Sequence, residues 1–287
     1  LLQNQQRSRS FVLAGVGTEW HVSRSTEIYG NISQAYRPIQ FADLTTPPTT
    51  DQIDANLTDA KGFNADLGYR GKLAEYLFFD ASVYYLQYNN RVGTIKQQNL
   101  DGSFYNLRTN VGNSSSKGIE AMFEFSPVKA FVDDSSWGDI SCFASYSYND
   151  ARYGEFKIVS LVDGALQEKN YKNNKVENAP EHILRTGVTY AWKGLALTTQ
   201  LSYVDEAFAD ANNTPEPSAN GQNGIIPAYA VWDLTLSYRQ GQKFSIKAGI
   251  NNLGNEQYFT RRSGGYPGPG LLPADGRTAF VSVAYKL

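Results

Sequence analysis

The sequence predicts an all-β protein, an antiparallel transmembrane β-barrel to which this chain contributes about eleven strands. Three observations predict this fold class. Hydrophobic residues alternate with polar residues in a period of two, which places them on opposite faces of a strand. The alternating segments are long enough to cross a membrane, and the connections between them are alternately short and long.

The period of two is clearest in residues 62–71, where Phe63, Ala65, Leu67 and Tyr69 alternate with polar residues or glycine. A tilted strand needs about 9–11 residues to cross a membrane, whereas strands of soluble sandwiches are usually about 5–6 residues long. The alternating segments are of the longer kind, which favours the membrane barrel. The predicted strands cover residues 10–22, 26–37, 61–70, 77–91, 117–126, 137–152, 182–192, 195–205, 228–240, 243–258 and 278–287.

The connections between these strands fall into two classes. The long ones are polar, rich in Asn, Gly, Pro and Ser, and show little hydrophobic patterning of their own. Outer-membrane barrels have short periplasmic turns at one end and long external loops at the other. We therefore expect the long connections to face the outside of the cell. The short connections are residues 23–25, 71–76, 127–136, 193–194 and 241–242, and the long ones are 38–60, 92–116, 153–181, 206–227 and 259–277.

An odd number of strands indicates an incomplete barrel. A spanning sheet has to close without a free edge, and single-chain bacterial barrels have an even number of strands. We therefore expect residues 1–287 to be the C-terminal part of an outer-membrane barrel, with earlier strands ahead of this sequence, which begins without an initiator Met or a signal peptide. The apolar row of the last strand ends on the final residue, as is typical of such barrels; it comprises Ala279, Val281, Val283, Tyr285 and Leu287.

The tryptophans fit the same interpretation. Trp20, Trp137 and Trp192 lie beside short turns, and Trp232 follows a long loop. Girdles of aromatic residues at the two membrane–water boundaries would place them there. The alternative is that tryptophan covers strand ends in any β protein.

Composition excludes several function classes. Lys+Arg 26 and Asp+Glu 28 give a net charge of −2, which argues against a nucleic-acid binder. The single cysteine, Cys142, rules out a disulfide framework and Cys-based metal clusters. Neither His21 nor His182 has a nucleophile in a recognisable setting, and the acidic run at residues 205–213 lacks the glycine and glutamate of a calcium loop. We predict no enzyme activity, no catalytic residue, no metal site and no cofactor.

Several segments resemble those of TonB-dependent receptors. Residues 26–39 (TEIYGNISQAYRPI) are similar to a strand and external loop of that family, and residues 251–259 (NNLGNEQYF) to its penultimate-strand motif. Residues 273–278 (PADGRT) resemble the segment before the last strand. The stretch VDEAFADANNT at 204–214 and the position of Gln40 are most similar to the ferric citrate (iron(III) dicitrate) branch.

The resemblance covers nearly the whole chain and implies a barrel of about 22 strands filled by an N-terminal plug domain. The chain would be the C-terminal half of a receptor in the outer membrane of a Gram-negative bacterium, in contact with lipid and lipopolysaccharide. The receptor would import a ferric chelate, ferric citrate or another ferric siderophore, using the TonB complex through a plug absent here. The rival functions are a passive outer-membrane porin, a membrane-embedded hydrolase that uses His182, and a soluble β-sandwich adhesin.

Six residues of the long loops are candidates for binding this anionic chelate. Guanidinium groups pair with carboxylates through two parallel hydrogen bonds, so arginines converging from several loops would form a cationic mouth. The alternative for each arginine is a pair with a neighbouring loop acid or a lipopolysaccharide phosphate. The candidates are Arg37, Gln40, Arg108, Arg261, Arg262 and Arg277.

Overall fold

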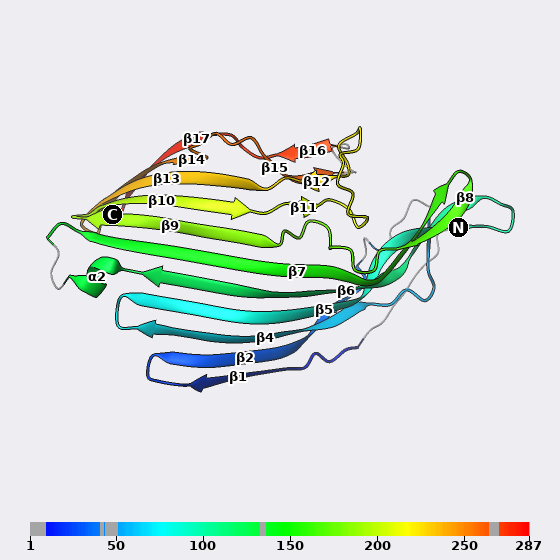
Figure 1. Cartoon of the computed structure of the whole chain (residues 1–287), viewed down its shortest axis with the longest axis horizontal. Coiled ribbons are helices and arrows are strands. Elements are labelled where there is room, and N and C mark those ends of the chain that lie inside the picture. Colours follow the sequence, from blue (N-terminus) through cyan, green and yellow to red (C-terminus); the bar gives the residue numbers. More distant parts are fainter. Residues whose placement is uncertain (1–9, 41–42, 44–50, 133–135, 264–269, 287) are drawn as a thin grey trace.

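The structure is a computed structural model that describes residues 10–40, 43, 51–132, 136–263 and 270–286. Eleven strands follow one another in chain order across one antiparallel sheet, with β1 and β17 at its two edges (Figure 1). This confirms the predicted fold class. No helix among the described residues is long and apolar enough to span a membrane. The strands are β1 (Gly15–His21), β2 (Thr26–Arg37), β4 (Ala60–Leu73), β5 (Leu77–Gln98), β6 (Phe104–Phe125), β7 (Asp139–Val162), β9 (His182–Trp192), β10 (Leu195–Val204), β13 (Tyr229–Gln240), β14 (Phe244–Asn251) and β17 (Thr278–Tyr285).

The register of the sheet gathers apolar side chains on one face. Leu67 of β4 lies opposite Val83 of β5, which lies opposite Ile119 of β6. These three side chains are 57%, 51% and 47% exposed. Because they form a continuous row that is open to the surroundings, this face is suited to contact lipid rather than a dry protein core.

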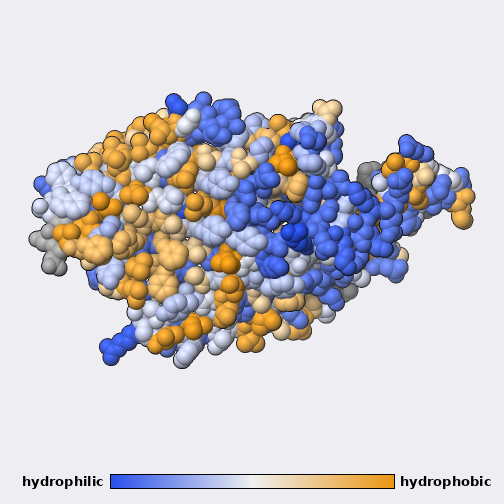
Figure 2. All heavy atoms as spheres, in the orientation of Figure 1, coloured by the Kyte–Doolittle hydropathy of each residue, from blue (hydrophilic) through white to orange (hydrophobic). Residues whose placement is uncertain are grey.

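The neighbouring row of the same three strands points to the other face and is polar. Ser82 lies opposite Gly68 on one side and Glu120 on the other. The sheet therefore has one apolar and one hydrated face, as the alternation predicted. Figure 2 shows apolar side chains spread over the strands at the short-turn end, whereas hydrophilic side chains dominate the long-loop end.

The tryptophans remain at the surface. All four are exposed, with values from 39% for Trp192 to 67% for Trp20. In the register of β1 and β2, Trp20 lies opposite Ile28 on the apolar face. An exposed indole at a strand end on that face is the arrangement expected of an aromatic girdle.

Two long connections are more ordered than the sequence predicted. The connection expected at residues 92–116 is mostly strand, because β5 continues to Gln98 and β6 begins at Phe104. The connection expected at 153–181 contains the end of β7 and the strand β8 (Ala165–Asn170), which pair as a hairpin. The prediction of unpatterned loops at these places is wrong.

A small hydrophobic core among the long connections explains their order. Val111, Tyr153 and Phe156 are buried, and the rings of Tyr153 and Phe156 stack with their centroids 4.2 Å apart. The Arg91 guanidinium lies 5.2 Å from the centre of the Tyr153 ring. Arg91 lies on β5, Val111 on β6, and Tyr153 and Phe156 on β7. Because the residues come from three strands, no local pattern in the sequence predicts their contact. Partly buried residues around the core are Ile95, Ile158, Tyr171, Val176 and Ala211.

Other boundaries differ by a few residues. The short connection at 127–136 contains a helical turn, α2 (Pro127–Phe131), with proline in its first turn, where a missing N–H costs nothing. Strand β14 ends at Asn251 rather than at residue 258, because Asn252 adopts a φ of +53°, which turns the chain out of the sheet. The predicted terminal position, Leu287, lies outside the described residues.

Candidate ligand-binding surface at the long-loop end

All six candidate residues lie in or beside the long connections, but they fall into two groups rather than one. Contacts among the described residues join the members of the first group, and the second shares only the last long connection. The first group lies where β2 ends and β6 extends beyond the sheet. The second lies on the hairpin of β15 (Phe259–Ser263) and β16 (Gly270–Pro273) and on the segment before β17.

The first group is organised by a carboxylate that the sequence analysis missed. Asp43 is 2% exposed and accepts hydrogen bonds from Nη2 of Arg108 at 2.7 Å and from Nη2 of Arg37 at 3.1 Å. The backbone N–H of Gln40 donates to the same carboxylate at 3.0 Å. Three of the six candidates therefore converge on one acid. We call Asp43, Arg37, Gln40 and Arg108 the Asp43 cluster.

The Asp43 cluster carries surplus positive charge. Burial alone would raise the pKa of Asp43, but hydrogen bonds from the Gln40 amide and from the Arg108 and Arg37 guanidiniums outweigh it and lower that pKa below its ordinary value. One carboxylate then faces two guanidiniums, which leaves one net positive charge. The side chains of Arg37 and Arg108 are 37% and 32% exposed, so this charge reaches the surface.

The loop that carries Asp43 is fastened to β6 by its own backbone. The short strand β3 (Asp51–Ile53) pairs in parallel with β6, and the Asp54 amide donates to the Arg108 carbonyl at 2.9 Å. Leu57 is 2% exposed at the end of this loop, and Asp59 accepts from the Ile39 amide at 2.8 Å. These contacts hold Arg108 and residues 51–59 together.

Arg262, in the second group, links the long connections 206–227 and 259–277 through hydrogen bonds. Its Nε and Nη2 donate to the carbonyl of Ile225 at 3.1 and 2.8 Å, and its Nη1 donates to the carbonyl of Gly221 at 3.0 Å. Ile225 begins the strand β12 (Ile225–Ile226), which pairs with β11 (Ala207–Phe208). All three nitrogens are thus engaged by backbone, and the side chain joins the last long loop to the one before it.

Arg261 and Arg277 are available to a ligand. Both are exposed, and neither side chain has a hydrogen-bond or ion-pair partner among the described residues. The Arg277 backbone is anchored, because its N–H donates to Oδ1 of Asn255 at 2.9 Å. These two guanidiniums meet the requirement for pairing with a carboxylate-rich anion without first breaking another contact.

Asn252 is a second residue whose role the sequence analysis missed. It is 3% exposed, its Oδ1 accepts from the Glu256 amide at 2.7 Å, and its Nδ2 donates to the Glu256 carbonyl at 2.9 Å. Its own backbone N–H donates to Oδ1 of Asp233 at 2.9 Å. The side chain thus shapes the turn that leads into the last loop. The sequence feature that could have indicated this turn is the Asn251-Asn252 pair at the start of the NNLGNEQYF segment.

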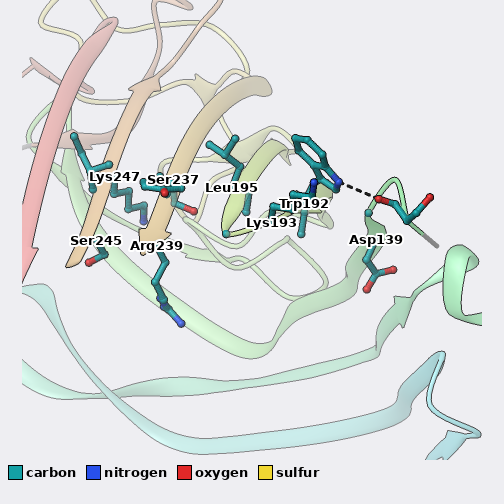
Figure 3. A pocket seen from close by; sticks show the side chains of 15 residues that line it. Asp139, Trp192, Lys193, Leu195, Ser237, Arg239, Ser245 and Lys247 are labelled. Carbon is teal, nitrogen blue, oxygen red and sulfur yellow. Dashed lines mark hydrogen bonds between the residues drawn. The ribbon is translucent and has the colours of Figure 1, made fainter. Parts of the chain in front are cut away.

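The opposite end of the sheet has a hollow of about 780 Å³ at the short turns (Figure 3). Charged residues of both signs line it, including Asp139, Arg239 and Lys247. Trp192 at its edge donates from Nε1 to the Ser136 carbonyl at 3.1 Å. This surface is mixed in charge and contains none of the six candidate residues.

Comparison with known proteins agrees with this architecture. A model of the family described as TonB dependent receptor-like, beta-barrel matches residues 3–253. The chain belongs to this family. The family comprises outer-membrane proteins of Gram-negative bacteria that act as transporters and not as enzymes. This agrees with the predicted localisation and with the prediction of no enzyme activity.

Solved structures share the fold at low sequence identity. The ferric citrate transporter FecA in its unliganded form is 20% identical with a TM-score of 0.72, over 95% of this chain and 38% of that one. The siderophore receptor PiuA from Acinetobacter baumannii is 20% identical with a TM-score of 0.72, over 96% and 36%. The copper transporter OprC is 16% identical with a TM-score of 0.66, over 94% and 38%. The chain spans less than two-fifths of these proteins, and the likeness shows the barrel fold alone.

Proposed function

We propose that this chain forms part of the barrel of a TonB-dependent outer-membrane transporter that imports an anionic ferric chelate, ferric citrate or a related carboxylate-rich siderophore, bound by the external loops. The observation that carries the proposal is a small set of arginines in and beside the long connections whose guanidinium groups are not each matched by a carboxylate. The Asp43 cluster has one net positive charge, and Arg261 and Arg277 are exposed without partners among the described residues.

The chemistry of these groups suits such a ligand. A guanidinium presents two parallel N–H groups that match a carboxylate, and it keeps its charge at any physiological pH. Citrate supplies several carboxylates to iron, so its ferric complex offers anionic oxygens in more than one direction. Arg261 and Arg277 would make the first contacts, and the Asp43 cluster would supply a fixed positive field from the other group.

Import also requires energy and a path through the barrel. We propose that a plug domain transmits energy from TonB and docks on the polar face of this sheet. The hollow at the short-turn end supports this, because Asp139, Arg239 and Lys247 offer charges of both signs to a docking surface. A passive porin would share the barrel, but the family match favours the receptor.

The test is a binding titration with the full-length protein in detergent. In the double variant Arg261→Ala with Arg277→Ala we expect ferric citrate to bind at least about tenfold more weakly, a loss of roughly 1.4 kcal/mol. Binding of a neutral hydroxamate siderophore should change by less than about twofold, and added salt should weaken only the citrate complex.

The matched control is Lys193→Ala, which removes an exposed charge at a short turn, at the opposite end of the sheet. It should leave ferric citrate affinity unchanged. Equal affinities of the double variant and the parent protein for ferric citrate would contradict the proposed site. If the parent protein shows no saturable binding at all, the porin becomes the better description.

A further inference from the structure

We propose that Glu181, His182 and Asp205 bind one divalent transition-metal cation of the Zn²⁺ class at the outer rim of the barrel. The three residues come from the beginning of β9 and the end of β10. The backbone places them together, because the Asp205 amide donates to the His182 carbonyl at 2.9 Å, one residue beyond the end of β10. One ligand atom from each of the three lies within 4.8 Å of the other two, and all three are half-buried.

The imidazole of His182 is already oriented for this purpose. Its Nδ1 is 2.8 Å from the hydroxyl of Tyr146, and its ring packs against Tyr146 and Tyr148 with centroids 6.0 and 5.3 Å away. A histidine that binds a metal through one nitrogen usually has its other nitrogen held by a hydrogen bond, which sets the tautomer and the ring plane. Nε2 of His182 has no partner among the described residues, so it is available as the ligand atom.

The carboxylates of Glu181 and Asp205 are likewise held through one oxygen atom each. Lys175 contacts Oε1 of Glu181 at 3.0 Å. Asp205 accepts through Oδ1 from the Tyr203 hydroxyl at 3.2 Å and from the Glu206 amide at 3.0 Å. No contact among the described residues uses Oε2 of Glu181 or Oδ2 of Asp205. Each of the three ligands is therefore positioned through one atom and open at another.

The chain contains a comparison group that lacks these properties. Glu19, His21 and Glu27 also lie within 4.8 Å of one another, at the short-turn end. There His21 Nε2 lies 3.2 Å from Oε2 of Glu27, and Arg70 Nε lies 2.6 Å from Oε1 of the same carboxylate. Both oxygens of Glu27 are engaged, and His21 already uses its Nε2 in that contact, so neither residue keeps the open ligand atom that Glu181 and His182 have. This group is therefore an ion-pair network rather than a metal site.

The donor set selects the class of metal. One imidazole nitrogen and two carboxylate oxygens suit Zn²⁺ and related first-row ions, with water completing the coordination. Calcium and magnesium prefer shells made almost wholly of oxygen and would gain little from His182. A bound ion would tie β9 to β10 where the long connections 153–181 and 206–227 leave the sheet. The side chain of His182 continues the apolar row through Ile119 and Tyr148, so the site lies at the lipid boundary.

The experiment is a titration of the full-length, metal-free protein in detergent with Zn²⁺ alone. The parent protein should bind one ion saturably, and His182→Ala and Asp205→Asn should each bind it at least about tenfold more weakly. The control His21→Ala should match the parent. X-ray absorption at the zinc edge should show nitrogen and oxygen neighbours at about 2.0–2.2 Å and no sulfur.

Asp205→Asn keeps the shape of the side chain, so a loss of zinc binding in a variant that remains folded reports on the ligand itself. Equal zinc affinity of the parent, His182→Ala and Asp205→Asn proteins would overturn the proposal. So would loss of binding in His21→Ala alone, or a parent protein that binds no zinc at micromolar concentrations. None of these outcomes bears on which chelate the transporter imports.

Discussion

Replacing Asp43 by asparagine should loosen residues 51–59 from β6 while the barrel stays folded. The substitution leaves the guanidiniums of Arg37 and Arg108 facing each other without the carboxylate that joins them. Removing one partner of a buried ion pair costs about 3–5 kcal/mol, and solvent screening of these partly exposed arginines reduces that to about 2–3 kcal/mol. Hydrogen exchange measured by mass spectrometry should therefore be about 30- to 150-fold faster in residues 51–59.

The same contact makes the loop sensitive to acid. Because the folded pKa of Asp43 is lowered, its stabilising contribution is complete above the ordinary aspartate pKa of about 4 and is lost as pH falls through the lowered value. After correction for the intrinsic exchange rate, which itself falls with pH, the protection of residues 51–59 in the parent protein should decrease in that acidic range. Asp43→Asn should lack the part of this decrease that Asp43 contributes.

The control is Asp163→Asn, which makes the same chemical change in an exposed turn whose φ of +50° asparagine also adopts. This variant should exchange like the parent in residues 51–59 at every pH. The assignment of Asp43 as the organising residue fails if Asp43→Asn and Asp163→Asn behave alike.

An arginine on the apolar face should destabilise the barrel, and one on the polar face should not. Val83→Arg places a charge beside Leu67 and Ile119, about midway along the spanning part of β5. An arginine at the bilayer midplane costs about 2–4 kcal/mol on the lipid face of an outer-membrane barrel. Unfolding by denaturant of the full-length protein in lipid vesicles should show a loss of this size.

The adjacent substitution Ser82→Arg is the matched control. Its side chain points to the other face, where Glu120 lies opposite in the next strand, and an arginine there can pair with that carboxylate. We expect a change of less than about 1 kcal/mol. A larger loss for Ser82→Arg than for Val83→Arg would mean that the two faces have been assigned the wrong way round.

The spanning sheet could be predicted from the sequence because its signal is local. The alternation around Leu67 alone specifies which side chains share a face, and strand pairing then extends the row to Val83 and Ile119. The packing of the long connections could not be predicted in this way. Val111 and Tyr153 are 42 positions apart, and their contact depends on the pairing of β6 with β7 and on the register shift between Gly112 and Ser114.

For the candidate site, the residue types in the sequence indicated which side chains could bind an anion. The sequence did not indicate which residues these side chains contact in the folded protein. Guanidinium chemistry predicted arginines that bind the carboxylates of a ligand, with pairing to a loop acid as the alternative. Arg37 and Arg108 follow the alternative, because both pair with Asp43. Asp43 lies 65 positions from Arg108, and nothing in the sequence indicates that pair. Arg262 looked like Arg261, yet its partners are backbone carbonyls that carry no sequence signal. Similarly, Asp205 joins His182 only through the register of β9 and β10.

The most direct test of the account is the side of the sheet that touches lipid. Single cysteines at residues 80–86 of β5, in a Cys142→Ala background, can carry spin labels in the full-length protein reconstituted into vesicles. Accessibility to oxygen should peak at residues 81, 83 and 85 and fall at 80, 82, 84 and 86, because only the odd positions share the apolar face with Leu67. Peaks at the even positions, or odd positions closed to oxygen as in a dry core, would contradict a lipid-facing barrel wall.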